Sequence, residues 1–77
     1  MSNSQVSISR AVRQFMTHEH MTQADLASRI GMTQSLLSRR LAGIRRWSID
    51  DLAALIPAGV NLEPIAHAMT GRGEAHR

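Results

Sequence analysis

Cysteine, lysine and tyrosine are absent from the 77 residues, and phenylalanine and tryptophan occur once each. Without cysteine the chain can form neither disulfides nor thiolate-ligated metal sites, and a reducing cytosol suits it. No apolar run approaches the roughly 18 residues of a membrane-spanning helix, and the first residues are polar and uncharged, so we expect neither a membrane span nor a signal peptide. Strand-like alternation is also absent, which favours an all-helical domain.

Charge of one sign is concentrated in the middle of the chain. All nine basic residues are arginines, and the formal net charge is +3. Residues 22–47 hold five arginines and one aspartate, a balance of +4, whereas residues 48–77 hold two arginines and four acidic residues, a balance of −2. A polyanion is the natural partner of such a segment. Charge alone would indicate no more than a solvated surface, so the expectation of a polyanionic partner depends on the motif in which these arginines lie.

Residues 22–43 have the pattern of two short helices around a tight turn. Apolar residues repeat at one-turn spacing on both sides of Gly31, namely Leu26, Ala27 and Ile30 before it and Leu37 and Leu41 after it. Thr22 and Thr33 stand where N-cap hydroxyls accept the unpaired amides of a first helical turn, and Asp25 can complete a capping box with Thr22. The sequence therefore predicts helices over residues 23–30 and 34–42, with Gly31 in the left-handed conformation between them.

The arrangement of Gln23, Ala27, Gly31, Met32 and Leu37 resembles the helix-turn-helix of the phage repressor and Cro family. The resemblance extends over roughly residues 8–69. It implies a lambda repressor-like fold, a compact all-α bundle of about five short helices. It also implies a cytoplasmic, sequence-specific transcriptional regulator, in a bacterium or a phage-infected host, that reads the major groove of a double-stranded DNA operator with its third helix. No cofactor and no small-molecule ligand are expected.

The remaining helices follow from periodicity and from helix-ending residues. We expect a first helix that begins between residues 4 and 7 and ends near residues 18–20, and a fourth over residues 49–56 that Pro57 and Gly59 terminate. Asn61 can cap a fifth helix that reaches about residue 69. Residues 1–69 then form a single domain and residues 70–77 a mobile tail. Trp47, directly before the predicted N-cap Ser48, is interpreted as a core residue, with a base-stacking platform as the alternative.

The predicted DNA contacts fall into two groups. Base edges are expected to meet the exposed residues of the first two turns of the third helix, which are Gln34, Ser35, Ser38 and Arg39. Phosphates are expected to meet Gln23, Thr33, Arg40, Arg45 and Arg46. The resemblance implies that Gln34 contacts adenine and that Gln23 bonds a phosphate and often the recognition-helix glutamine. Many family members differ at the positions of Arg40 and Leu41, so whether Arg39 or Arg40 faces the bases stays open.

One recognition helix reads too few base pairs to single out a site in a genome, so we expect a weak homodimer that forms on DNA. Its predicted contact residues are Ile56, Val60, Leu62 and Ile65.

The alternative functions are a helix-turn-helix module that binds a protein, an antitoxin-type autorepressor and a truncated repressor. An enzyme is not expected, because no catalytic spacing of residues is present. His18 and His20 point about 200° apart on a helix, so no metal site is expected either.

Overall fold

The computed structural model describes residues 3–62, which form four α-helices and contain no strand. The helices are α1 (Asn3–His18), α2 (Gln23–Ile30), α3 (Gln34–Leu41) and α4 (Ile49–Ala58). This confirms the all-helical fold class. The predicted fifth helix and the predicted tail at residues 70–77 lie outside the described residues.

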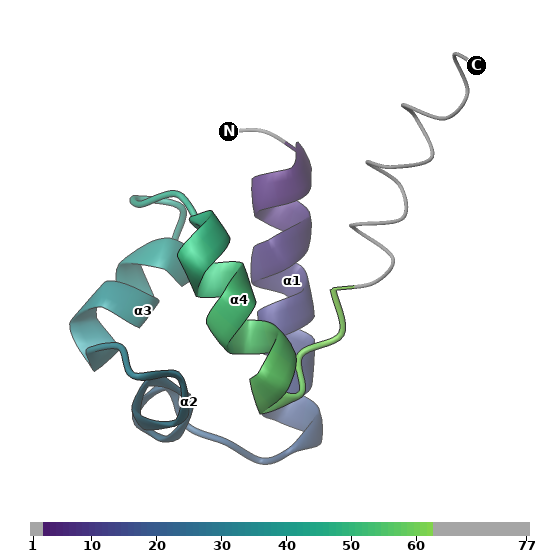
Figure 1. The fold of residues 1–77 in the computed structure, drawn as a ribbon, viewed down its shortest axis with the longest axis vertical. Coiled ribbons are helices and arrows are strands. Elements are labelled where there is room, and N and C mark those ends of the chain that lie inside the picture. Colours follow the sequence, from purple (N-terminus) through teal and green to yellow (C-terminus); the bar gives the residue numbers. More distant parts are fainter. Residues whose placement is uncertain (1–2, 63–77) are drawn as a thin grey trace.

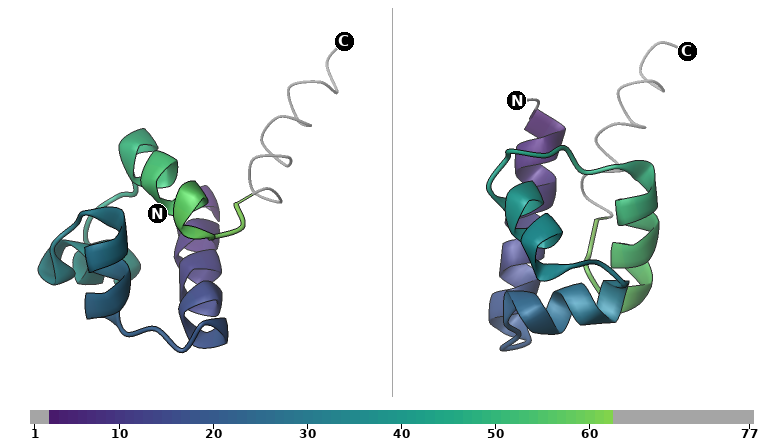
Figure 2. Two further views of the ribbon diagram at one scale, coloured as in Figure 1. Left: turned by 60° about the horizontal axis from the view of Figure 1, so that its bottom comes forward. Right: turned by 90° about the vertical axis from the view of Figure 1, so that its left-hand side faces the viewer.

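In Figure 1, α3 lies on the left with α2 below it, α4 lies in the middle and α1 lies to the right of α4. α2 packs against both α3 and α4, and α1 packs against α3. The right-hand view of Figure 2 looks onto the face that carries α3, with α2 below it and the connection from α3 to α4 above it. The start of the second helix, the whole third helix and that connection therefore share one side of the molecule.

Each helix contributes one completely buried aliphatic side chain to the core. These are Val12 of α1, Leu26 of α2, Leu37 of α3 and Leu55 of α4, all without exposed surface. Burying a side chain of this size stabilises a fold by about 1.5–3 kcal/mol relative to leaving it in water. The other core members are Ile8, Ala27, Leu41, Trp47, Val60 and Leu62.

The turn between α2 and α3 has the predicted geometry. Thr22 and Asp25 form a capping box at the start of α2, and the Thr33 hydroxyl accepts the Leu36 amide at 3.1 Å at the start of α3. Gly31 adopts a φ of +72°, in the left-handed region that a residue with a Cβ seldom occupies. Met32, next along, donates its amide to the carbonyl of Ala27 at 2.9 Å, which closes the turn.

Several predicted helix ends are corrected by one or two residues. α1 begins at Asn3, and α3 ends at Leu41. α4 continues through Pro57 to Ala58 and stops at Gly59, which has a φ of +115°. Proline removes one amide from the last helical turn, and its usual acceptor four residues earlier belongs to the exposed residue Ala53, where water can replace the bond. Gly59, and not Pro57, ends the helix.

Candidate nucleic-acid interface

The exposed side of α3 carries all four residues predicted to read bases. Gln34, Ser35, Ser38 and Arg39 are exposed, while Leu37 and Leu41 turn another side of the helix into the core. At about 100° of rotation per residue the four exposed side chains occupy an arc of about 140°. The described helix therefore presents a continuous polar strip, with its glutamine at the first helical position and its arginine one turn further on.

The N-terminus of α3 is left electrostatically positive. Its first turn contains no acidic residue, whereas the first turn of α2 contains Asp25 and that of α4 contains Asp50 and Asp51. The positive end of a helix dipole attracts anions, and an acidic side chain there would repel a phosphate. Among the three short helices, α3 is the one whose start carries no acidic side chain to oppose an approaching phosphate.

The C-terminal end of α3 is anchored from α1. The Arg13 guanidinium of α1 donates from Nη2 to the Leu41 carbonyl at 2.9 Å. A cation near the last carbonyls complements the negative end of the helix dipole and also satisfies an acceptor that has no partner within the helix. This contact fixes the far end of the polar strip against the longest described helix.

Residues 42–48 join α3 to α4, and we call this segment the arginine loop. Its two arginines, Arg45 and Arg46, are exposed. The loop turns back on α3, since the amides of Ile44 and Arg45 both donate to the carbonyl of Arg39, at 3.0 and 3.3 Å. The loop therefore begins just beyond the end of the polar strip, and the right-hand view of Figure 2 shows this connection between α3 and α4.

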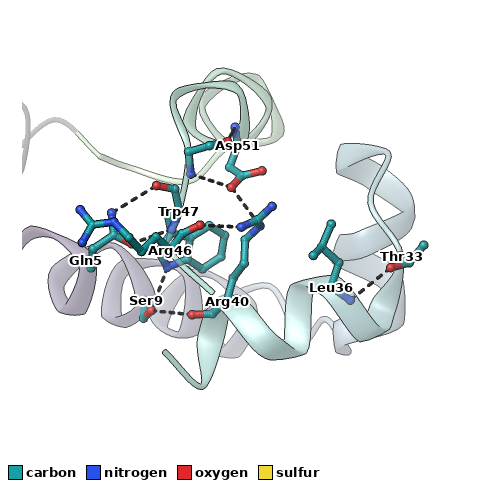
Figure 3. A network of polar contacts seen from close by, with 9 residues as sticks. Gln5, Ser9, Thr33, Leu36, Arg40, Arg46, Trp47 and Asp51 are labelled. Carbon is teal, nitrogen blue, oxygen red and sulfur yellow. Dashed lines mark hydrogen bonds and ion pairs between the residues drawn. The ribbon is translucent and has the colours of Figure 1, made fainter. Parts of the chain in front are cut away.

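Arg40, predicted as a phosphate contact, is occupied within the protein. Its Nε lies 2.9 Å from Asp51 Oδ2, and its Nη1 donates to the Arg46 carbonyl (Figure 3). The side chain is only 16% exposed. The sequence left open whether Arg39 or Arg40 faces the bases. In the structure Arg39 is exposed, whereas the Arg40 guanidinium braces the arginine loop against α4.

A buried polar network, which the sequence pattern did not predict, holds the other side of the arginine loop. The Gln5 carboxamide accepts the Trp47 amide at 2.6 Å and donates to the Trp47 carbonyl at 3.2 Å. The Trp47 indole donates to Ser9 Oγ at 2.9 Å (Figure 3). Gln5 and Ser9 lie four residues apart on one face of α1, next to the core residues Ile8 and Val12. Their position as polar residues on an otherwise apolar stripe was the one sequence signal that could have indicated this network.

The two residues predicted to contact phosphates from the helix starts are Thr33, the N-cap of α3, and Gln23, the first residue of α2. Thr33 is exposed, and its hydroxyl oxygen accepts an amide while its proton stays available to donate. Gln23 opens α2 and is half-buried, beside Leu41 and Met16. Within residues 3–62 no hydrogen bond joins Gln23 to Gln34, so the pairing that the resemblance implied is not formed in this structure.

The predicted dimer residues differ in exposure. Ile56 is 59% exposed, whereas Val60 and Leu62 are 3% and 6% exposed and belong to the core. A side chain packed in the core cannot meet a second copy without opening the fold, so Val60 and Leu62 are withdrawn from the predicted contact. Ile65 lies outside the described residues. Ile44, within the arginine loop, and Ile49, directly after it, are 73% and 80% exposed.

The described part of the chain offers neither a metal site nor a membrane span. Across residues 3–62 no group of three or more histidine, cysteine or acidic side chains is placed to hold a metal ion. No helix within those residues is long and apolar enough to cross a membrane.

A family model for the helix-turn-helix matches residues 12–56, more than half of the chain. The chain therefore belongs to this family, the DNA-binding helix-turn-helix proteins of the phage repressor and Cro type. The match begins within α1 and ends within α4, so it includes the complete α2–turn–α3 unit and the arginine loop. No curated protein and no solved structure matches the chain.

Proposed function

We propose that this chain is a sequence-specific transcriptional regulator of the Cro and repressor type, which reads the major groove of a double-stranded operator with the first two turns of α3. The observation that carries this proposal is the exposed strip formed by Gln34, Ser35, Ser38 and Arg39, on a helix whose N-terminus has no acidic residue. A helix with this face fits the major groove, which is wide enough to admit it.

The side chains of the strip match the hydrogen-bonding groups of base edges. A glutamine can accept from and donate to adenine at once, an arginine can donate twice to guanine, and serine can bond either base. We assign the base contacts to these four residues, with Arg39 the arginine that faces the bases. Arg40 is assigned to bracing the arginine loop, because Asp51 and the Arg46 carbonyl already hold its guanidinium.

The phosphate contacts fall on both sides of the strip. Gln23 and Thr33 stand at the starts of α2 and α3, and Arg45 and Arg46 lie on the arginine loop. Contacts of this kind fix the register of a protein on the duplex without specifying sequence. We also propose that two copies bind a two-fold site, with Ile56 the exposed member of the predicted contact set. The regulator would act in the cytoplasm.

Selection of bound duplexes from a random library with the full chain tests the proposal. We expect a single enriched motif, with two half-sites whose centres lie about 34 Å apart along the duplex. A helix-turn-helix module that binds only proteins is the competing function, and it predicts no enrichment and almost no binding to random duplex at low salt. Mass measurement on full and half sites then tests the dimer, since one copy on each full site would contradict it.

A further inference from the structure

The arginine loop is held at both ends by local contacts and between them by a contact from α1, which is far away in the sequence. On the α3 side, the Arg39 carbonyl accepts the amides of Ile44 and Arg45. On the α4 side, the Ser48 amide donates to Asp51 Oδ2 at 2.7 Å. Between these anchors, the Gln5 carboxamide of α1 closes on both backbone groups of Trp47, 42 residues further along the chain.

The chemistry of the Gln5 contact is specific to a carboxamide. One side chain offers a donor and an acceptor in a single plane, which is the combination that the amide and carbonyl of a peptide require. Glutamine therefore bonds the Trp47 backbone on both sides, as Figure 3 shows. A glutamate of the same length would still accept the Trp47 amide, but its second oxygen would face the Trp47 carbonyl without a proton to donate.

We propose that Gln5 is a positioning residue for DNA binding, which fixes the arginine loop so that Arg45 and Arg46 meet the phosphates in a prepared conformation. Only the part of this inference that concerns DNA binding rests on the proposed function. Arg46 directly precedes the residue that Gln5 clamps, and Arg45 is bonded to the Arg39 carbonyl, so neither backbone moves freely while both contacts persist. A loop ordered before binding loses less conformational freedom when it binds, which favours affinity.

The first arm of the test uses the free protein and no DNA. Amide hydrogen exchange is measured for the parent, for Gln5→Ala, for the isosteric Gln5→Glu and for the control Gln14→Ala, which removes an exposed glutamine from the same helix. We expect exchange at Trp47 to accelerate at least about tenfold in both Gln5 variants, while exchange at the core amide of Leu26 changes far less. Equal acceleration at Trp47 and Leu26 would mean that Gln5 stabilises only the whole fold, and would overturn the proposal.

The second arm measures DNA affinity against salt, at a temperature where circular dichroism shows each variant folded. For the Gln5 variants we expect the slope of log K against log salt to fall by about 0.9 for each phosphate that the arginine loop no longer binds. The ratio of specific to random affinity should stay at the parent value, and Gln14→Ala should match the parent. A parent-like slope together with a parent-like affinity in Gln5→Glu, alongside a loosened Trp47 amide, would overturn the role in DNA binding. A parent chain that binds no DNA would contradict the proposed function and would leave the exchange result standing.

Discussion

Replacing Trp47 tests whether the sequence's single tryptophan is a structural or a DNA-stacking residue. Trp47 is 5% exposed and packs among core residues from several helices, so truncating it to alanine leaves a large cavity. Such truncations cost about 3–5 kcal/mol. The substitution keeps the backbone groups that bond Gln5, and the Ser9 hydroxyl can still donate to the Arg40 carbonyl at 3.4 Å, so the missing packing dominates the cost.

The size of this destabilisation decides the assay. Stability of about 0.05–0.15 kcal/mol per residue gives a domain of this size about 4–12 kcal/mol in total, so Trp47→Ala should lose between about a quarter and all of the parent's stability. Urea unfolding followed by far-ultraviolet circular dichroism measures this without relying on tryptophan fluorescence. Trp47→Phe is the matched control, since it keeps a ring and should be destabilised much less. A Trp47→Ala variant that unfolds like the parent but binds DNA poorly would refute the core assignment and favour base stacking.

Two further predictions concern the arginine loop and the α2 cap. Arg45→Ala and Arg46→Ala should weaken specific and random DNA binding alike, each lowering the salt slope by about 0.9, and an unchanged slope in both would place these side chains away from phosphates. The pKa of Asp25 lies below its ordinary value of 3.8, mainly because the Thr22 amide donates to its carboxylate and also because of the Thr22 hydroxyl and Arg29. The capping stabilisation is therefore present above that value and disappears as pH falls through the folded pKa, so the stability of the parent should fall more between about pH 5 and pH 2 than that of Asp25→Asn. Parallel pH profiles would contradict this.

The α2–turn–α3 unit was predictable because its signals are local. A cap, a periodic apolar face and a glycine at the turn act within a few residues, and the observed bounds of α2 match the predicted residues 23–30. The capping box of Ser48 and Asp51 and the burial of Trp47 follow from the same kind of local pattern. Exposure of the α3 strip follows in turn from the positions of Leu37 and Leu41.

The long-range contacts were not predictable from pattern alone. No local sequence signal distinguishes the exposed Arg39 from Arg40. The two side chains differ because Arg40 pairs with Asp51, and the position of Asp51 depends on how α4 packs. Gln5 lies where the first helix was predicted to begin, between residues 4 and 7, and its role appears only when the fold brings Trp47 to it. Val60 and Leu62 were predicted as dimer contacts, but both belong to the described core. The contacts of Gln5 with Trp47 and of Arg40 with Asp51 span 42 and 11 residues of the sequence.

The most direct test of base reading by α3 is the affinity of Gln34→Ala for the selected site and for random duplex at one salt concentration. Gln34 is exposed at the first position of α3, so its removal should leave the fold intact. Removing a bidentate bond to a base should cost about 1–3 kcal/mol on the selected site, relax the preference at one base pair and leave random binding close to the parent value. An equal weakening on both duplexes, or none on either, would contradict base reading by this helix.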